Sequence, residues 1–251
     1  FFTFPTVASN CAACTAIAVI YNADGTFKEY FYPKCPSYHT FINTRIIADS
    51  PDSLLWAGIG DALSKEYEVL FATRAEELFH TTLLGAQLSK ACTAPLIDFG
   101  AKALEDCKAN KASYELEQVA LDIIISTGIV SNLTSGGEKY YYNSSLGHAF
   151  YYGSTVIPKA EKHLHGEVVS FGVLCLLTYD NQLEERARIM KFHKTIGLPT
   201  CLADMEITEE DIPAIVEKAS TVREWTCVPY VTDKDKFAKA ILETDKVGKT
   251  F

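Results

Sequence analysis

The chain has 251 residues, of which 48% are hydrophobic and 22% charged, which is an ordinary composition for a globular protein. Its formal net charge of −9 disfavours a nucleic-acid partner, because phosphate binding needs a surface rich in lysine and arginine. No apolar run approaches the length of a membrane span, so no membrane partner is expected.

The eight cysteines are scattered without the spacing of a disulfide framework. We therefore expect mostly buried thiols in a protein of the reducing cytoplasm. The first residues lack the basic and apolar regions of a signal peptide. The chain starts with Phe1 rather than methionine, and we expect it to be part of a longer protein.

The first 50 residues contain the strand-like patterns. Residues 15–21 are rich in strand formers, 22–25 read Asn-Ala-Asp-Gly, and 26–32 are rich in aromatics, which together predict a β-hairpin over 15–32. Residues 40–44 suit one further short strand. A sheet of this size is too small to stand alone, so it must pack against helices or continue a sheet formed by other strands.

From residue 51 onwards the patterns indicate helices. Two helices are expected over 53–57 and 61–72, separated by a break at Gly58-Ile-Gly60. Further helices are expected within 75–108 (two, broken near Pro95) and over 114–130, 147–160, 166–178 and 183–196, the last stopped by Gly197. Start signals at Thr208 and Thr232 predict two more. The chain thus divides into a short β-rich segment, 1–50, and one helical domain, 51–251.

Three residues in the helical domain form a set of candidate metal ligands. Asp61 follows two glycines, His148 follows Gly147, and His165 precedes Gly166. One carboxylate and two imidazoles offer one O and two N donors to a divalent ion. Three protein ligands leave a coordination position free, which is the arrangement of a catalytic rather than a structural site.

Each of these residues also has a simpler interpretation. Asp61 could complement the dipole of a helix, His148 could be a core histidine, and His165 could cap a loop. Cys11-Ala-Ala-Cys14 could be a redox dithiol or half of a zinc ribbon, but the sequence has no second such pair, and the segment leads into a strand rather than a helix.

Three segments in order make the metal interpretation specific. Residues 58–63 (GIGDAL), 148–153 (HAFYYG) and 163–172 (HLHGEVVSFG) together resemble the glycerol dehydrogenase group of metal-dependent alcohol dehydrogenases. Residues 5–9 and 15–32 resemble the same family, and the likeness covers essentially the whole chain. It implies a mostly α fold: a dehydroquinate synthase-like helical domain that binds metal and substrate over 51–251. The hairpin within 1–50 would be the C-terminal part of an α/β nicotinamide-binding domain.

The resemblance also implies roles for individual residues. Asp61, His148 and His165 match the family's ligands for one divalent metal, with zinc preferred and iron or manganese acceptable. The positions that match contacts to NAD or NADP are Thr6, Ser9, Thr15, Ile17 and Tyr21. Cys11 matches a substrate-binding position.

Two features depart from the glycerol dehydrogenase pattern. Cys11 stands where those enzymes carry an aspartate that meets the polyol, and loss of that negative charge makes an anionic substrate easier to admit. Residues 10–13 (NCAA) and the long stretch between 137 and 148 instead resemble the hydroxycarboxylate dehydrogenase branch, which reduces 2-oxo acids. Tyr151 and Tyr152 replace a usual His-Asn pair, which changes the polar lining of the pocket.

The resemblance therefore implies an NAD(P)-linked dehydrogenase, a homo-oligomer, that acts on the hydroxyl of a small polyol or 2-hydroxy acid. One alternative is a hydroxycarboxylate dehydrogenase that reduces 2-oxo acids. A dehydroquinate synthase-type cyclase would need more lysine and arginine around the candidate metal site. An alternative of another class is a non-catalytic helical fragment that lacks its cofactor domain.

Overall fold

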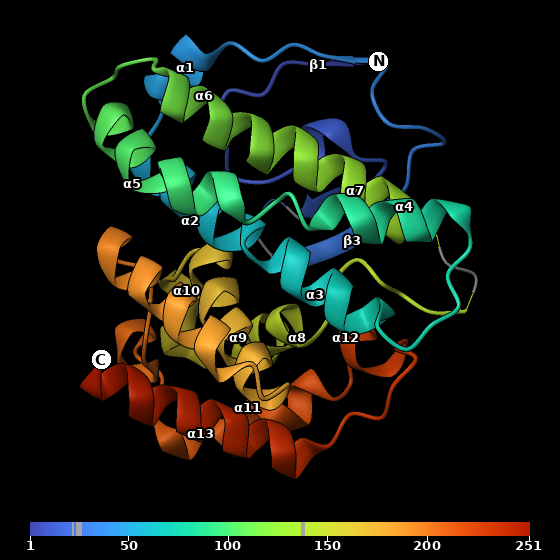
Figure 1. The fold of residues 1–251 in the computed structure, drawn as a ribbon, viewed down its shortest axis with the longest axis vertical. Coiled ribbons are helices and arrows are strands. Elements are labelled where there is room, and N and C mark those ends of the chain that lie inside the picture. Colours follow the sequence, from blue (N-terminus) through green and yellow to red (C-terminus); the bar gives the residue numbers. More distant parts are fainter. Residues whose placement is uncertain (22, 24–26, 137–138) are drawn as a thin grey trace.

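The computed structural model describes residues 1–21, 23, 27–136 and 139–251. This part of the chain is mostly helical, with two short two-stranded sheets close to the N-terminus (Figure 1). The expected mostly α fold, with a small β-rich segment ahead of the helices, is confirmed.

The β-rich segment forms two pairs of strands. β2 (Ala18–Tyr21) and β3 (Phe27–Phe31) are antiparallel, with Ala18 opposite Phe31, as expected for a hairpin. The turn predicted at 22–25 lies outside the described residues, except for residue 23. β1 (Phe2–Thr3) pairs in parallel with β4 (His39–Thr40). The strand expected at 40–44 is wrong beyond Thr40, because residues 41–43 belong to no strand and Thr44 begins a helix.

Thirteen α-helices follow within the described residues. They are α1 (Thr44–Ala48), α2 (Asp52–Ala62), α3 (Ser64–Thr73), α4 (His80–Ser89), α5 (Ala94–Lys108), α6 (Tyr114–Leu121), α7 (Thr127–Thr134), α8 (Leu146–Ser154), α9 (His165–Tyr179), α10 (Leu183–Ile196), α11 (Ile212–Ala219), α12 (Arg223–Thr226) and α13 (Lys234–Thr250). A π-helical segment, η2 (Asp122–Ser126), joins α6 to α7. Short 3₁₀ segments are η1 (Ala12–Cys14), η3 (Pro158–Lys162), η4 (Leu202–Met205) and η5 (Glu209–Asp211).

The helix ends follow from local chemistry. The Oδ1 atom of Asp233 accepts a hydrogen bond of 2.8 Å from the Lys236 N–H and caps α13. Pro95 lies in the first turn of α5, as expected for the break between α4 and α5. Gly197, with φ of 77°, ends α10 in a left-handed conformation that favours glycine.

The break expected at Gly58-Ile-Gly60 is wrong. α2 continues through these glycines to Ala62, and the interruption lies at Leu63, whose φ of −55° and ψ of −28° are themselves helical. The glycines instead allow other backbone segments to approach α2 closely. Helix α8 likewise ends at Ser154, so the helix expected over 147–160 stops early and a 3₁₀ turn follows.

Two hydrophobic cores meet at α2 and α9. One core includes Phe150, Phe171 and Phe237 from α8, α9 and α13, and the other includes Leu55 and Leu96 from α2 and α5. α9 is buried on nearly every face and packs against α2, α8 and α13 (Figure 1). The end of α2 therefore lies at the junction between the two halves of the helical domain.

One helical run departs from the expectation about membranes. Residues 114–134, which comprise α6, η2 and α7, are long and apolar enough to cross a bilayer by length and composition alone. More than half of this run's apolar window is buried inside the fold, which is the environment of a core helix. Its apolar character therefore follows from internal packing.

Candidate metal centre

The structure brings Asp61, His148 and His165 together from three helices. Asp61 Oδ1 lies 3.5 Å from His148 Nε2 and 3.3 Å from His165 Nε2. One potential ligand atom from each residue lies within 4.8 Å of the other two. Asp61 and two histidines more than 80 positions further along the chain thus form one cluster of an O donor and two N donors.

A close crossing of α2 and α9 places Asp61 beside His165. A Cβ atom on Gly166 would lie 1.9 Å from the Ala57 carbonyl oxygen, and one on Gly60 would lie 2.4 Å from the Gly166 carbonyl oxygen. Only residues without a Cβ allow backbones to approach this closely. Asp61 and His165 are the chain neighbours of these glycines, so the crossing sets their separation.

A second crossing positions His148. A Cβ atom on Gly172 of α9 would lie 2.3 Å from the Gly147 carbonyl oxygen at the start of α8. His148 follows Gly147 and therefore lies against α9, where its imidazole ring has its centroid 5.4 Å from that of His165. Both histidines are thus fixed relative to the same helix.

Glu68 of α3 holds His148 from the side opposite Asp61. Its Oε2 atom lies 2.6 Å from His148 Nδ1, and its Oε1 atom accepts hydrogen bonds from the Ser145 and His148 N–H groups at 2.8 and 2.9 Å. A carboxylate on one ring nitrogen orients the other nitrogen towards a metal, which is the usual outer-shell arrangement of metal-binding histidines. We did not single out Glu68 from the sequence; its position seven residues after Asp61, on the same side of consecutive helical turns, was the available signal.

The electrostatics of the cluster favour positive charge. Burial lowers the pKa of His148, but the charges of Glu68 and Asp61 and their hydrogen bonds to the ring raise it to about 10 overall. Burial would raise the pKa of Asp61, but hydrogen bonds from His148 and His165 hold it well below its ordinary value. A site that stabilises positive charge between one carboxylate and two imidazoles fits a divalent cation.

His163 lies outside the three-residue cluster. Its Nδ1 atom is 2.7 Å from Glu167 Oε1, while Glu167 Oε2 accepts a hydrogen bond of 3.0 Å from the Leu164 N–H at the start of α9. Glu167 therefore caps α9 and binds His163 at the same time. These two contacts give His163 and Glu167 of the His-Leu-His-Gly-Glu segment a structural role at the start of α9.

Tyr151 forms an aromatic wall beside the cluster. Its ring centroid lies 4.2 Å from that of His165, with the two planes at 76°. Tyr151 lies one turn after His148 on α8, so the substitution seen in the sequence falls directly beside two of the candidate ligands. An edge-to-face contact of this kind restricts rotation of the His165 ring.

The N-terminal segment docks on α2 close to Asp61. A Cβ atom on Gly58 would lie 2.2 Å from the Ala8 carbonyl oxygen, so residues 8 and 9 rest on α2 about one turn before Asp61. Cys11, the candidate substrate residue, lies on the α7 side, where its Sγ atom is 3.7 Å from Ser131 Oγ. The structure thus brings Ser9, a candidate cofactor residue, to α2 about one turn before Asp61.

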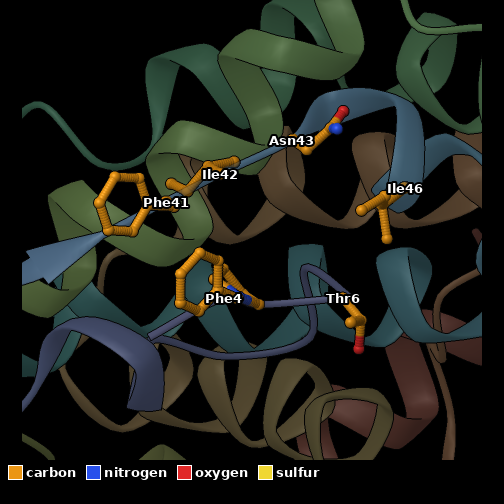
Figure 2. A pocket seen from close by; sticks show the side chains of 7 residues that line it. Phe4, Thr6, Phe41, Ile42, Asn43 and Ile46 are labelled. Carbon is orange, nitrogen blue, oxygen red and sulfur yellow. The ribbon is translucent and has the colours of Figure 1, made fainter. Parts of the chain in front are cut away.

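Thr6, a candidate cofactor contact, lines a pocket of about 350 Å³ between the N-terminal segment and α1. The other residues that line it are Phe4, Pro5, Phe41, Ile42, Asn43 and Ile46. Figure 2 shows the rings of Phe4 and Phe41 facing one another on one side of the pocket; their centroids are 4.9 Å apart. The pocket offers a flat apolar surface and a few polar groups.

The other candidate cofactor residues lie along the chain beyond this pocket. Ser9 is beside Gly58, and Thr15 is buried, with its hydroxyl donating a hydrogen bond of 3.2 Å to the Ile17 carbonyl. The Thr15 hydroxyl therefore already has a partner in its own turn. The side chain of Tyr21 lies outside the described residues.

The chain is similar in sequence to known dehydrogenases. No family model matches the chain. The glycerol dehydrogenase of Escherichia coli is 33% identical over 98% of this chain, which spans 68% of that protein. Hydroxycarboxylate dehydrogenase A of Escherichia coli is 31% identical over 92% of this chain, which spans 63% of that protein.

The fold has a similar counterpart among solved structures. The structure of a probable glycerol dehydrogenase from Sinorhizobium meliloti superimposes with a TM-score of 0.85 at 28% identity, covering 99% of this chain and 70% of that one. The chain therefore spans about two thirds of the length of these relatives. The sequence identity and the matching fold together show that this chain belongs to the glycerol dehydrogenase family of metal-dependent alcohol dehydrogenases.

Proposed function

We propose that Asp61, His148 and His165 hold one divalent metal ion, preferably zinc, in an NAD(P)-linked dehydrogenase. The observation that supports this most strongly is the convergence of one carboxylate and two imidazoles within 4.8 Å of one another. The substrate is a small polyol or a 2-hydroxy acid, whose CH–OH group loses a hydride and a proton to become a ketone. An ion bound by three protein groups would lower the pKa of a substrate hydroxyl in its open position and polarise the ketone in the reverse direction.

The protein groups around the cluster have defined tasks. Glu68 accepts a hydrogen bond from His148 Nδ1–H and so keeps the lone pair of Nε2 available to the ion. Tyr151 packs edge-on against His165 and excludes water from one side of that ring. Cys11, at the position where the resemblance implies an aspartate, contributes no carboxylate to substrate binding.

The cofactor is NAD or NADP, held in part by Thr6, Ser9, Thr15, Ile17 and Tyr21. The docking of residues 8 and 9 on α2 supports this, because it places the segment within about one helical turn of Asp61. The free state of all eight cysteines, each in the described part of the chain, suits a reducing cytoplasm. Assembly into a homo-oligomer follows from the family resemblance alone.

Metal analysis of the purified protein together with turnover tests the proposal. We expect about one equivalent of metal, and metal-dependent turnover of glycerol or 2-oxobutyrate with NAD or NADP forms. Asp61→Ala and His148→Ala should each abolish both, whereas His163→Ala should keep the metal, because His163 is bound to Glu167 outside the cluster. Retention of metal and turnover by both ligand variants would contradict the proposal.

The non-catalytic alternative predicts a different outcome. A helical domain without the rest of a dinucleotide site would bind the metal through the same three residues and still show no turnover. NADH binding, measured by the rise in NADH fluorescence, distinguishes the dehydrogenase from the non-catalytic alternative. Only an active dehydrogenase must bind NADH.

A further inference from the structure

Lys65 is a buried cation without a counter-ion among the described residues. Its residue is only 6% exposed, and its Nζ atom donates hydrogen bonds to Asn143 Oδ1 at 2.7 Å and to the Asn143 carbonyl at 3.2 Å. Both partners are neutral oxygens, and no carboxylate in the described part of the chain lies within 4.0 Å of it. A buried charge is costly unless it is paired. An anion bound beside Lys65 would therefore pair this buried positive charge and stabilise it.

Lys65 lies on the same side of the helix as the candidate metal ligand. It follows Asp61 by four residues, and Leu63, the one residue between α2 and α3, has helical backbone angles. Residues four apart on a helix have Cβ atoms about 5–6 Å apart. Glu68, three residues further on, contacts His148, which confirms that this face points towards the cluster.

The residues around Lys65 include part of α7, the helix that also contacts Cys11. Asn143 Oδ1 also accepts a hydrogen bond of 3.3 Å from Thr134 Oγ1, on the last turn of α7. Ser131 lies three residues before Thr134, and its Oγ atom is 3.7 Å from Cys11 Sγ. The Lys65 ammonium group, through Asn143, and Cys11 therefore contact residues one turn apart on α7, Thr134 and Ser131.

The acidic groups on neighbouring elements do not neutralise Lys65. Glu68 is engaged with His148 and with two backbone N–H groups. Asp122 of η2 is buried, and burial raises its pKa to about 7, so that it carries only part of a negative charge near neutral pH. Replacement of the family's aspartate by Cys11 removes a third negative charge.

We propose that the Lys65 ammonium group binds the carboxylate of a 2-hydroxy or 2-oxo acid whose reacting oxygen faces Asp61, His148 and His165. The carboxylate of such an acid is attached to the reacting carbon, so the group that binds it must lie close to the cluster. Lys65 meets this requirement by its spacing, since it follows Asp61 by one helical turn. A neutral polyol could accept a hydrogen bond from the ammonium group but carries no negative charge to pair with it. The inference rests on the proposed function and narrows its substrate class to small 2-oxo and 2-hydroxy acids.

Binding of oxamate to the zinc-loaded protein tests this assignment. Oxamate carries a carboxylate next to an amide carbonyl, resembles a 2-oxo acid and cannot be reduced. Calorimetric titration, with and without NADH, should show binding that Lys65→Met weakens about 30-fold or more, because the loss of a charge-assisted contact amounts to about 2 kcal/mol. Lys239→Met, which removes an equal charge from the exposed surface of α13, should leave the affinity within about twofold.

A second variant keeps the test decisive if Lys65→Met does not fold. Asn143→Asp places a carboxylate against Lys65 without removing the lysine, so it should also weaken oxamate binding about tenfold or more. Binding of propane-1,2-diol, which has no carboxylate, should change little in either variant.

Two results would overturn the assignment: no binding of oxamate to zinc-loaded wild-type protein, or wild-type affinity in whichever of the two variants folds. Failure of the proposed function looks different, because it would appear as absence of zinc from the Asp61 cluster or of any metal-dependent turnover.

Discussion

Glu68 shows how much a candidate metal-binding histidine depends on a neighbouring residue outside the three-residue cluster. Its two carboxylate oxygens accept hydrogen bonds from the His148 ring and from the first turn of α8. The same side chain therefore sets both the protonated nitrogen of the ring and the position of the helix that carries it.

Glu68→Gln should lower zinc affinity by roughly 10–100-fold while leaving the fold intact. The amide oxygen can still accept from the backbone N–H groups, but an amide cannot orient the ring as a carboxylate does. Competition with a chromophoric chelator measures the affinity. Glu66→Gln, the same change two residues earlier on α3, is the matched control and should bind zinc like wild type. Equal affinities in the two variants would refute this role of Glu68.

A single buried histidine away from the site should make stability depend on pH. His193 of α10 is fully buried, its Nδ1 atom is 2.8 Å from the Pro199 carbonyl oxygen, and burial lowers its pKa to about 4. The unfolded chain protonates this ring near pH 6.5, whereas the native protein resists protonation down to about pH 4. The native state therefore loses stability as the pH falls through this window and is not penalised above it.

Urea unfolding at a series of pH values checks this effect. The wild-type free energy of unfolding should fall by about 3 kcal/mol from this residue alone between pH 7 and pH 4. His193→Gln keeps a hydrogen-bond donor and removes the titration, so its curve should be flatter over the same range. Parallel curves for the two proteins would show that His193 is not the source.

At the scale of secondary-structure elements, the site depends on helices that cross at glycines. Gly60, Gly147, Gly166 and Gly172 all lie at backbone contacts where a Cβ atom would approach a carbonyl oxygen or a side chain within 3.0 Å or less. Each candidate ligand is the chain neighbour of one of them. The separation of the ligands is therefore set by the crossings of α2, α8 and α9.

Gly166→Ala should separate α2 from α9, because the new methyl group would overlap the Ala57 carbonyl. Overpacking of this kind costs about 1–3 kcal/mol or more, and we expect a lower unfolding midpoint together with weaker zinc binding. Chemical denaturation and metal titration measure the two effects. Gly136→Ala is the control, since a Cβ at Gly136 would meet no atom within 4 Å and should be tolerated. Wild-type stability and zinc affinity in Gly166→Ala would contradict the crossing argument.

Some features of these elements were predictable from the sequence and others were not. Asp61, His148 and His165 could be singled out because each lies beside glycine in a segment that resembles one family. The same glycines misled the helix assignment, since Gly58 and Gly60 suggested a break in a helix that continues through them. A local pattern does not reveal that a second helix lies against the glycines.

Lys65 and Glu68 were missed for a related reason. Both read as ordinary charged residues on a helix surface, and only the packing of α3 against α7, α8 and α9 buries them. Spacing relative to Asp61, by four and seven residues, was the signal that could have identified them. No comparable pattern in the sequence predicts the π-helical turn at η2.

At the scale of the whole molecule, two cores meet along α2 and α9, and the candidate metal centre lies where they join. The N-terminal segment reaches the same place from the other side through its contact with Gly58. The three candidate metal ligands and Ser9, a candidate cofactor residue, therefore lie close to the same end of α2. This arrangement makes the metal centre the central claim.

Diffraction from zinc-soaked crystals, recorded at the zinc absorption edge, tests that claim most directly. The account predicts one strong anomalous peak about 2.0–2.2 Å from an Asp61 carboxylate oxygen and from Nε2 of both His148 and His165. A peak at Cys11 and Cys14 instead, or no peak between Asp61 and the two histidines at saturating zinc, would contradict it.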